Sequence, residues 1–304
     1  MTLVDRAIAR TLPLVPRAVV GRVAARYIAG AELADACRVV RSLNAEGKPA
    51  TLDVLGEEVT SPTEAAVFAA AYLEVLAVVE REGLDANVSV KPTALGLELG
   101  RDVFHENLET VVRAAAERGN FVRVDMEDSA TTDATLATYR ELREAGHENL
   151  GIVLQAGLRR TLDDVRALAD LRPSVRVCKG IYVEPEEIAF ADADEIRESF
   201  ARTVEGLLDA GCYVAVATHD ERLLDRCLRL VRERGLGPDR YELQFLLGVK
   251  PDVATRLVHQ GHRLRVYVPF GPRWYEYSVR RLRENPRMAT TIALALLRRP
   301  ATRR

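Results

Sequence analysis

Two adjacent arginines near the C-terminus, Arg280 and Arg281, are well suited to binding a small anion. They belong to segment 267–285, YVPFGPRWYEYSVRRLREN, in which a turn rich in proline and glycine separates an apolar run from a predicted helix. On that helix Tyr277, Arg280, Arg281 and Glu284 share one face, because they are spaced i, i+3, i+4 and i+7. Paired guanidinium groups bind a carboxylate through several N–H donors. The segment therefore predicts a carboxylate clamp, and a solvated basic helix is the alternative.

A second set of polar side chains lies at the ends of strand-like runs. Its members are Lys91, Arg123, Asp125, Gln155, Arg176, Lys179, Thr218, His219, Gln244 and Tyr267. Such ends meet at one face of a parallel barrel, where active sites form. These donors, with Asp125 as the one clear inward acid, suit a polar cofactor rich in carbonyl and phosphate oxygens, and Lys91 suits a carboxylated substrate. Structural alternatives are a buried Lys91–Asp125 ion pair, glutamines that satisfy loop backbone, and a His219 that starts a helix beside Asp220.

Strand-like and helix-like segments alternate regularly after about residue 50. The eight strand-like runs are Ala50–Gly56, Asn87–Lys91, Phe121–Met126, Leu150–Gln155, Ser174–Lys179, Tyr213–Thr218, Tyr241–Leu246 and Arg263–Val268. Helical crossovers between consecutive strands imply parallel pairing. The sequence therefore predicts an α/β fold of the (β/α)8 barrel type. An open doubly wound sheet is the alternative, but no GxGxxG motif follows a strand.

Local signals mark where the predicted helices begin and end. Ser61 before Pro62, and Thr161 with Asp164 three residues later, have the pattern of helix N-caps. Glycines that suit helix C-termini are Gly83, Gly119, Gly146, Gly211 and Gly235. The last helix, from Met288, is expected to be a buried closing segment.

Composition excludes several classes of function. The 304 residues carry a formal net charge of -2, so the chain has no general electrostatic footprint for nucleic acid. Neither the four cysteines nor the histidines, including His259 and His262, have metal-binding spacing, so no metal is expected. No apolar run reaches the length of a membrane span, and the nearest, Ala65–Val79, is predicted to be a buried helix.

Residues 1–45 are predicted to form an N-terminal helical arm, ahead of a barrel over 46–304. Residues 1–31 contain five arginines and a single acid, Asp5. This composition also occurs in organellar transit peptides, but the serine enrichment of such peptides is missing. An amphipathic arm that packs on the barrel, on a partner subunit or on a membrane surface is the favoured interpretation.

The chain resembles the monofunctional bacterial proline dehydrogenases over essentially all of its length after residue 45. The resemblance rests on eight motifs in order: TLDVLGEEVTS, VSVKPTALG, VDMEDS, VLQA, RVCKGIY, ATHDE, QFLLG and YVPFGPRWYEYSVRRLREN. It implies a distorted (β/α)8 barrel that oxidises L-proline to 1-pyrroline-5-carboxylate, the first step of proline degradation to glutamate. It also implies hydride transfer from proline C5 to N5 of FAD.

The resemblance assigns the substrate-side roles as follows. Arg280 and Arg281 would bind the proline carboxylate, and Lys91 would add a contact to it. Tyr267 would pack on the pyrrolidine ring, where a smaller residue is typical of members that prefer hydroxyproline, and Leu246 would help to enclose that ring. Asp125 would anchor this network, and it counts as catalytic together with Arg176 and Tyr267.

The resemblance also implies a cofactor site. Arg176 would donate a hydrogen bond near flavin N5, and Gln155 would contact the pyrimidine edge of the flavin. The rest of the FAD would be held by Met126, Lys179, Gly180, Ile181, Thr218 and His219. Cys178 and Ile181 depart from the family pattern, in which Val and Ala are frequent, and so put the packing of the cofactor in doubt.

A membrane quinone is the electron acceptor that the resemblance implies, since it fits a cytoplasmic chain with a basic arm that contacts the inner face of the cell membrane. A homo-oligomer stays open. Two other classes remain as alternatives: a Schiff-base lyase that uses Lys91 or Lys179, and a barrel that binds an amino acid or flavin as a sensor.

Overall fold

Eight parallel strands form a closed barrel in the computed structural model of the chain, which describes residues 21, 24–56, 59–275, 277 and 278. Each strand pairs with its neighbours in sequence, and β8 pairs with β1 to close the ring. The strands are β1 Ala50–Val54, β2 Ala86–Val90, β3 Val122–Val124, β4 Leu150–Gln155, β5 Ser174–Cys178, β6 Tyr213–Ala217, β7 Tyr241–Leu246 and β8 Leu264–Phe270. The predicted (β/α)8 barrel is confirmed.

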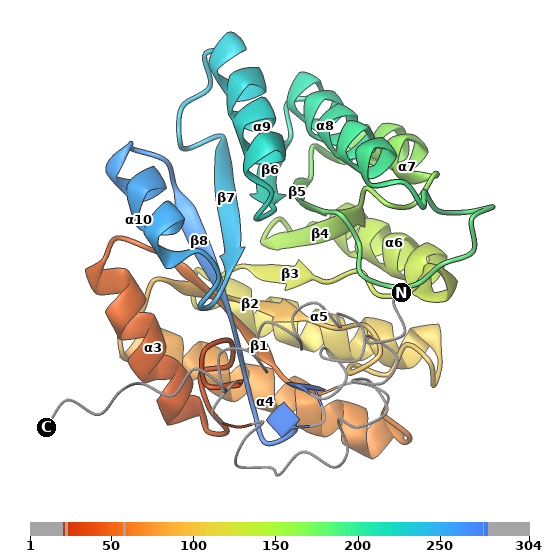
Figure 1. Cartoon of the computed structure of the whole chain (residues 1–304). Helices are drawn as coiled ribbons and strands as arrows, with labels where there is room; N and C mark the ends of the chain where they lie inside the picture. Colours follow the sequence, from red (N-terminus) through yellow and green to blue (C-terminus); the bar gives the residue numbers. More distant parts are fainter. Residues whose placement is uncertain (1–20, 22–23, 57–58, 276, 279–304) are drawn as a thin grey trace, which may run out of the picture.

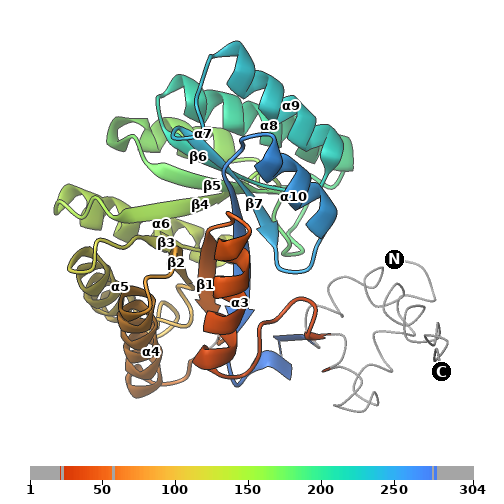
Figure 2. The same cartoon turned by 90° about the vertical axis from the view of Figure 1, so that its left-hand side faces the viewer.

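Helices surround this ring, as Figure 1 shows. They are α3 Leu33–Ala45, α4 Pro62–Arg81, α5 Arg101–Ala116, α6 Ser129–Glu144, α7 Thr161–Leu168, α8 Ala193–Asp209, α9 Glu221–Glu233 and α10 Pro251–His259, with a short 3-10 helix at Ala169–Leu171. Helix α3 precedes β1 and packs against both β8 and β1, where Figure 2 shows it lying along the barrel. Residues 1–20, 22 and 23 of the predicted arm and the segment from Met288 lie outside the described residues, whereas Ala24 and Ile28 are buried in a small cluster with Leu55. The division of the chain at residue 45 stays a prediction.

The predicted helix signals are confirmed with one exception. The Ser61 hydroxyl accepts a hydrogen bond from the Glu64 amide at the start of α4, and the five predicted C-terminal glycines all have a positive φ. Thr161, however, is not an N-cap: it is the first residue of α7, and its hydroxyl donates to the carbonyl oxygen of Gln155. Asp164 instead accepts hydrogen bonds from the Arg160 side chain. The motif was misread because Thr161 helps to hold the end of β4.

Helix α4 is the one helix in the described part of the chain that is long and apolar enough to cross a membrane. It packs against β1, β2 and α5, and it buries Ala65, Ala69, Tyr72 and Leu76 among others. The predicted helix over Ala65–Val79 is confirmed, but it is buried on one face only, and Val67 on its outer face is 63% exposed.

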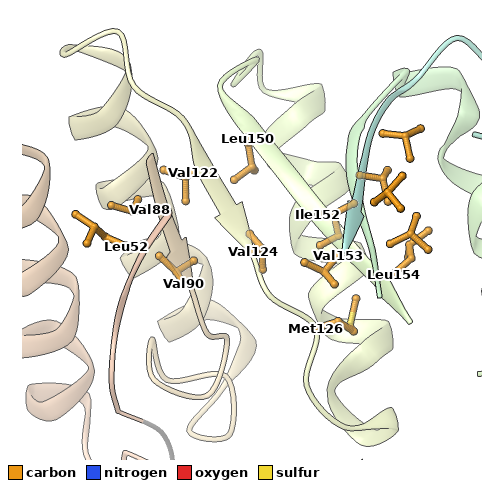
Figure 3. Packing of buried hydrophobic residues seen from close by; sticks show 14 of the residues in the cluster. Leu52, Val88, Val90, Val122, Val124, Met126, Leu150, Ile152, Val153 and Leu154 are labelled. Carbon is orange, nitrogen blue, oxygen red and sulfur yellow. The ribbon is translucent and has the colours of Figure 1, made fainter. Parts of the chain in front are cut away.

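The apolar core lies between the strands and the helices. Leu52, Val88, Val124 and Ile152 are fully buried there, and Figure 3 shows them with their neighbours along β1 to β4. Because side chains alternate across a strand, the residues next to them in sequence point into the barrel. The core thus leaves the barrel interior to a different set of side chains.

Polar and small side chains fill much of that interior, where many barrels carry branched apolar residues. The inward positions include Thr51, Asp53, Asn87, Ser89, Arg123, Gly151, Arg176, Ala215, Glu242, Gln244, Arg265 and Tyr267, which pair with one another in register from strand to strand. Gly151 is required beside Arg123, since a β-carbon there would lie 2.8 Å from the Ser174 carbonyl oxygen as well as 2.6 Å from Arg123 Nη1. The interior is therefore held largely by hydrogen bonds.

Candidate active site

Asp125, Arg176 and Tyr267 come together at the carboxyl end of the barrel. Arg176 Nη1 donates to Asp125 Oδ1 at 2.6 Å, and the Tyr267 hydroxyl donates to Asp125 Oδ2 at 2.8 Å. The Ser89 hydroxyl also donates to Asp125 Oδ1, at 2.7 Å. Both oxygens of this carboxylate are thus held by donors from three different strands.

The Tyr267 ring completes this cluster. Arg176 Cζ lies 5.1 Å from the ring centroid, within the range of a cation–π contact. Burial raises the pKa of Tyr267 well above its ordinary value, and the nearby carboxylates of Asp125 and Asp53 act in the same direction. The hydroxyl therefore remains a donor at physiological pH.

Lys91 reaches the cluster through Asp53. Its ammonium group donates to Asp53 Oδ1 at 2.6 Å, and both side chains are buried. Burial raises the pKa of Asp53 although Lys91 opposes that shift. The alternative in which Lys91 pairs with Asp125 is wrong, because Asp125 is paired with Arg176 and Lys91 with the acid at the end of β1.

Gln155, Met126 and Gly180 meet beside this cluster. Gln155 Nε2 donates to the carbonyl oxygens of Met126 and Glu127 at 2.9 and 2.7 Å, so the amide does satisfy loop backbone. Gly180 has a φ of +94°, and a β-carbon there would lie 3.1 Å from Gln155 Oε1. Only glycine lets the chain after β5 pass so close to this amide.

Lys179 and Thr218 meet at Asp220. Lys179 Nζ and Arg197 Nε both lie 2.7 Å from Asp220 Oδ2, and the Asp220 amide donates to the Thr218 hydroxyl. Burial would raise the pKa of Asp220, but hydrogen bonds from Arg197 and Lys179 outweigh it and lower that pKa. Asp220, rather than His219, caps α9 by accepting from the Leu223 amide. The sequence alternative for His219 is therefore wrong.

His219 instead contacts the end of β7. Its Nε2 accepts from the Leu246 amide at 3.0 Å, and its ring lies 4.8 Å from that of Phe245. Burial lowers the pKa of His219 to about 4, so the ring is neutral and carries its proton on Nδ1. Leu246 is 47% exposed at the mouth of the barrel, and Ile181 is 44% exposed on the loop that follows β5.

Several functional candidates were not assigned a role from the sequence. Asp53, Ser89 and Glu242 share the inward period-two positions of their strands with predicted residues, and that alternation is the signal that could have found them. Arg280 and Arg281 lie outside the described residues.

One guanidinium nitrogen of Arg176 is available to donate a hydrogen bond to a ligand. Arg176 Nη2 is buried and has no hydrogen-bond partner in the described part of the chain. A buried donor of this kind favours a ligand that brings an acceptor or a negative charge.

Comparisons with known proteins agree on one family. The family model described as Proline dehydrogenase matches residues 36–293. The chain is 38% identical to a proline dehydrogenase of Deinococcus radiodurans, over 90% of each chain. It is 35% identical to proline dehydrogenase 2 of Bacillus subtilis, over 87% of this chain and 88% of that protein.

Solved structures give the same fold. Proline utilization A from Bdellovibrio bacteriovorus, in a crystal structure of the protein inactivated by N-propargylglycine, has a TM-score of 0.79 and 25% identity. The match covers 86% of this chain and 32% of that protein.

Proposed function

Because this chain belongs to the proline dehydrogenase family and is thus an oxidoreductase acting on proline in the first step of its catabolism, we propose that it transfers hydride from proline C5 to N5 of FAD. The products would be 1-pyrroline-5-carboxylate and reduced FAD, which would pass its electrons to a quinone. Family membership sets aside the lyase and sensor alternatives. The observation that carries the flavin proposal is the buried, unpartnered Arg176 Nη2 at the carboxyl end of the barrel.

The residues around Arg176 fit such a cofactor. Arg176 offers a cationic donor for the region of N5, and Gln155, which would contact the pyrimidine edge, is packed closely against Gly180. Lys179, Thr218 and His219 would hold the remainder, with the Nδ1–H of neutral His219 as a further donor, and Met126 and Ile181 would give apolar contact. When bound, FAD would supply the two-electron acceptor that no side chain provides.

The substrate would lie between this cofactor and the Asp125 cluster. Arg280, Arg281 and Lys91 would bind its carboxylate, so that C5 is oriented for transfer. Tyr267 and Leu246 would enclose the pyrrolidine ring. Tyr267 keeps its own proton, because its pKa is raised by burial, so we propose that the amine proton of proline leaves to solvent.

Ring packing on Tyr267 makes a prediction about selectivity. Tyr267→Ser should weaken the preference for proline over hydroxyproline, measured as the ratio of the two kcat/KM values. An unchanged ratio would count against contact between Tyr267 and the ring.

The experiment that tests the proposed reaction is an absorption spectrum before and after anaerobic addition of L-proline. Flavin bands that bleach with proline support both cofactor and reaction. A colourless protein that cannot be reconstituted with FAD refutes the proposal. N-propargylglycine, which inactivated the Bdellovibrio protein, should inactivate this chain in the presence of the cofactor.

We further propose a cytoplasmic location, with the basic segment of the N-terminal arm, residues 1–31, touching the inner face of the membrane, and we leave a homo-oligomer open. Proline-dependent reduction of a soluble ubiquinone analogue, compared with the same assay on vesicles that contain a long-chain quinone, tests both acceptor and membrane contact. Failure to reduce either quinone would refute the acceptor proposal. Loss of vesicle-stimulated activity on deletion of residues 1–31 would support the role of the arm.

A further inference from the structure

A line of buried hydrogen bonds runs down the inner side of β7 from Arg176. Arg176 Nε donates to Gln244 Oε1 at 2.5 Å, and Gln244 Nε2 donates to Glu242 Oε1 at 2.5 Å. All three side chains are at least nine-tenths buried. The far end of this line lies deep inside the barrel, away from the proposed substrate site.

The Gln244 amide can adopt only one orientation here. A carboxylate accepts hydrogen bonds and the Nε–H of arginine donates one, so the amide nitrogen must face Glu242 and the oxygen must face Arg176. A flipped amide would set two donors against each other and place its oxygen against the carboxylate. Arg176 and Glu242 therefore select the same orientation of the amide, and Glu242 holds its nitrogen so that the oxygen stays directed at Arg176.

The Glu242 carboxylate is itself held in place by Arg265. Arg265 Nε lies 3.1 and 3.0 Å from its two carboxylate oxygens, and Arg265 Nη1 donates to the Ala50 carbonyl oxygen at 2.7 Å. Burial would raise the pKa of Glu242, but Arg265 and the Gln244 amide outweigh it and lower that pKa. Glu242 is thus an ionised acceptor anchored to the strand pair β8–β1.

Two anchors on different edges then define the plane of the Arg176 guanidinium. Gln244 holds Nε, while Asp125 and Ser89 hold Nη1 at 2.6 and 3.2 Å. Nη2 is the one nitrogen left over, and its direction follows from the other two because the group is rigid and planar.

We propose that Glu242 and Gln244 are positioning residues that aim Arg176 Nη2 at the reacting end of the site. This inference rests on the proposed role of Arg176 beside the flavin. It adds that the orientation of this arginine is set by a carboxylate at the base of β7, which touches neither substrate nor cofactor.

Glu242→Gln, Gln244→Met and the double variant test this in the FAD-loaded protein. Each single change should lower kcat about tenfold. The KM for proline should change less than about threefold, because the residues proposed to bind the carboxylate of proline are unchanged. The midpoint potential of bound FAD without proline should fall by about 30 mV, which corresponds to a tenfold change in the equilibrium constant of a two-electron couple. The double variant should match Gln244→Met alone, since Glu242 acts through Gln244.

Tyr241→Phe is the matched control. Tyr241 lies on β7, next to Glu242 but on the other face, and its hydroxyl meets His262 Nδ1 at 2.6 Å. This variant should lose stability and keep both kcat and potential. Gln244→Met retains the Glu242–Arg265 pair, so it decides the matter if Glu242→Gln does not fold.

Unchanged kcat and potential in folded Gln244→Met, or fully additive effects in the double variant, would overturn the inference. Arg176→Lys separates this failure from that of the proposed function. If Arg176→Lys alters potential and kcat while the Glu242 and Gln244 variants do not, only the positioning inference is wrong. If Arg176→Lys also has no effect, the proposed role of Arg176 fails as well.

Discussion

Replacing Tyr267 by phenylalanine removes one hydroxyl group from the centre of the site and keeps the ring. That hydroxyl donates to Asp125 Oδ2 at 2.8 Å, while the ring lies over the Arg176 guanidinium. The substitution therefore separates the hydrogen bond from the packing of the ring. Asp125 would keep its contacts to Arg176 and Ser89 on Oδ1 and would lose this donor to Oδ2.

The magnitude follows from the type of bond. A hydrogen bond to a charged group contributes about 1.5–3 kcal/mol. If the whole of it is needed in the transition state, kcat falls about 10- to 150-fold, at 1.36 kcal/mol for each factor of ten. The KM for proline should change less than about threefold, because the ring that would contact the pyrrolidine remains.

Steady-state kinetics with L-proline, together with thermal unfolding, check this expectation. Tyr241→Phe again serves as the control, because it removes a tyrosine hydroxyl bond on the outer face of the barrel. A Tyr267→Phe enzyme with kcat within twofold of wild type would refute the argument that Asp125 depends on this donor.

Three further predictions concern other parts of the site. Arg281→Met should raise the KM for proline by orders of magnitude while FAD stays bound, as steady-state kinetics and the flavin spectrum would show; a near-wild-type KM would sink the carboxylate clamp. Glu184 accepts from the Ser129 amide and hydroxyl, both at 2.7 Å, so Glu184→Ala should speed hydrogen exchange over residues 181–188, whereas exposed Glu187→Ala should not. The His219 pKa of about 4 lies below its ordinary value, so the unfolded state takes up the proton first as pH falls. Between pH 7.5 and pH 5 the wild type should therefore lose about 2 kcal/mol of stability relative to His219→Gln. Urea unfolding at both pH values measures this difference, and parallel curves for the two proteins would contradict it.

The barrel could be predicted because its sequence signals are local. Leu150–Gln155 and Tyr241–Leu246 were bounded correctly, and the other strands differ by a few residues at their ends. Their places near the ends of strand-like runs then predicted that Asp125, Arg176 and Tyr267 lie at one face of the barrel, and the closed barrel brings them within hydrogen-bonding distance.

Pairing inside the barrel could not be predicted in the same way. Lys91 could reach either Asp53 or Asp125, and the choice depends on the register of β1 against β2 and β8, which is a property of the closed ring. Thr161 was misread for a related reason, since its hydroxyl donates to the carbonyl oxygen of Gln155 at the end of β4, a contact that depends on how the chain folds after that strand. Local sequence fixes which side chains face inward, while the register decides which of them meet.

The two faces of each strand have different roles: the outer face contributes to stability, and the inner face positions charged side chains. On the outer face, residues such as Val124 and Ile152 are buried against helices, and their removal from water supplies stability. On the inner face, Arg123, Arg176 and Arg265 are held by carboxylates, hydroxyls and carbonyl oxygens, and burying such charges gives little net stability. A barrel filled with branched apolar side chains would be easier to stabilise, but it could not fix the direction of a guanidinium group. The polar interior is therefore best explained by the need to orient Arg176, whose guanidinium group is held by hydrogen bonds that extend from the mouth of the barrel to its base.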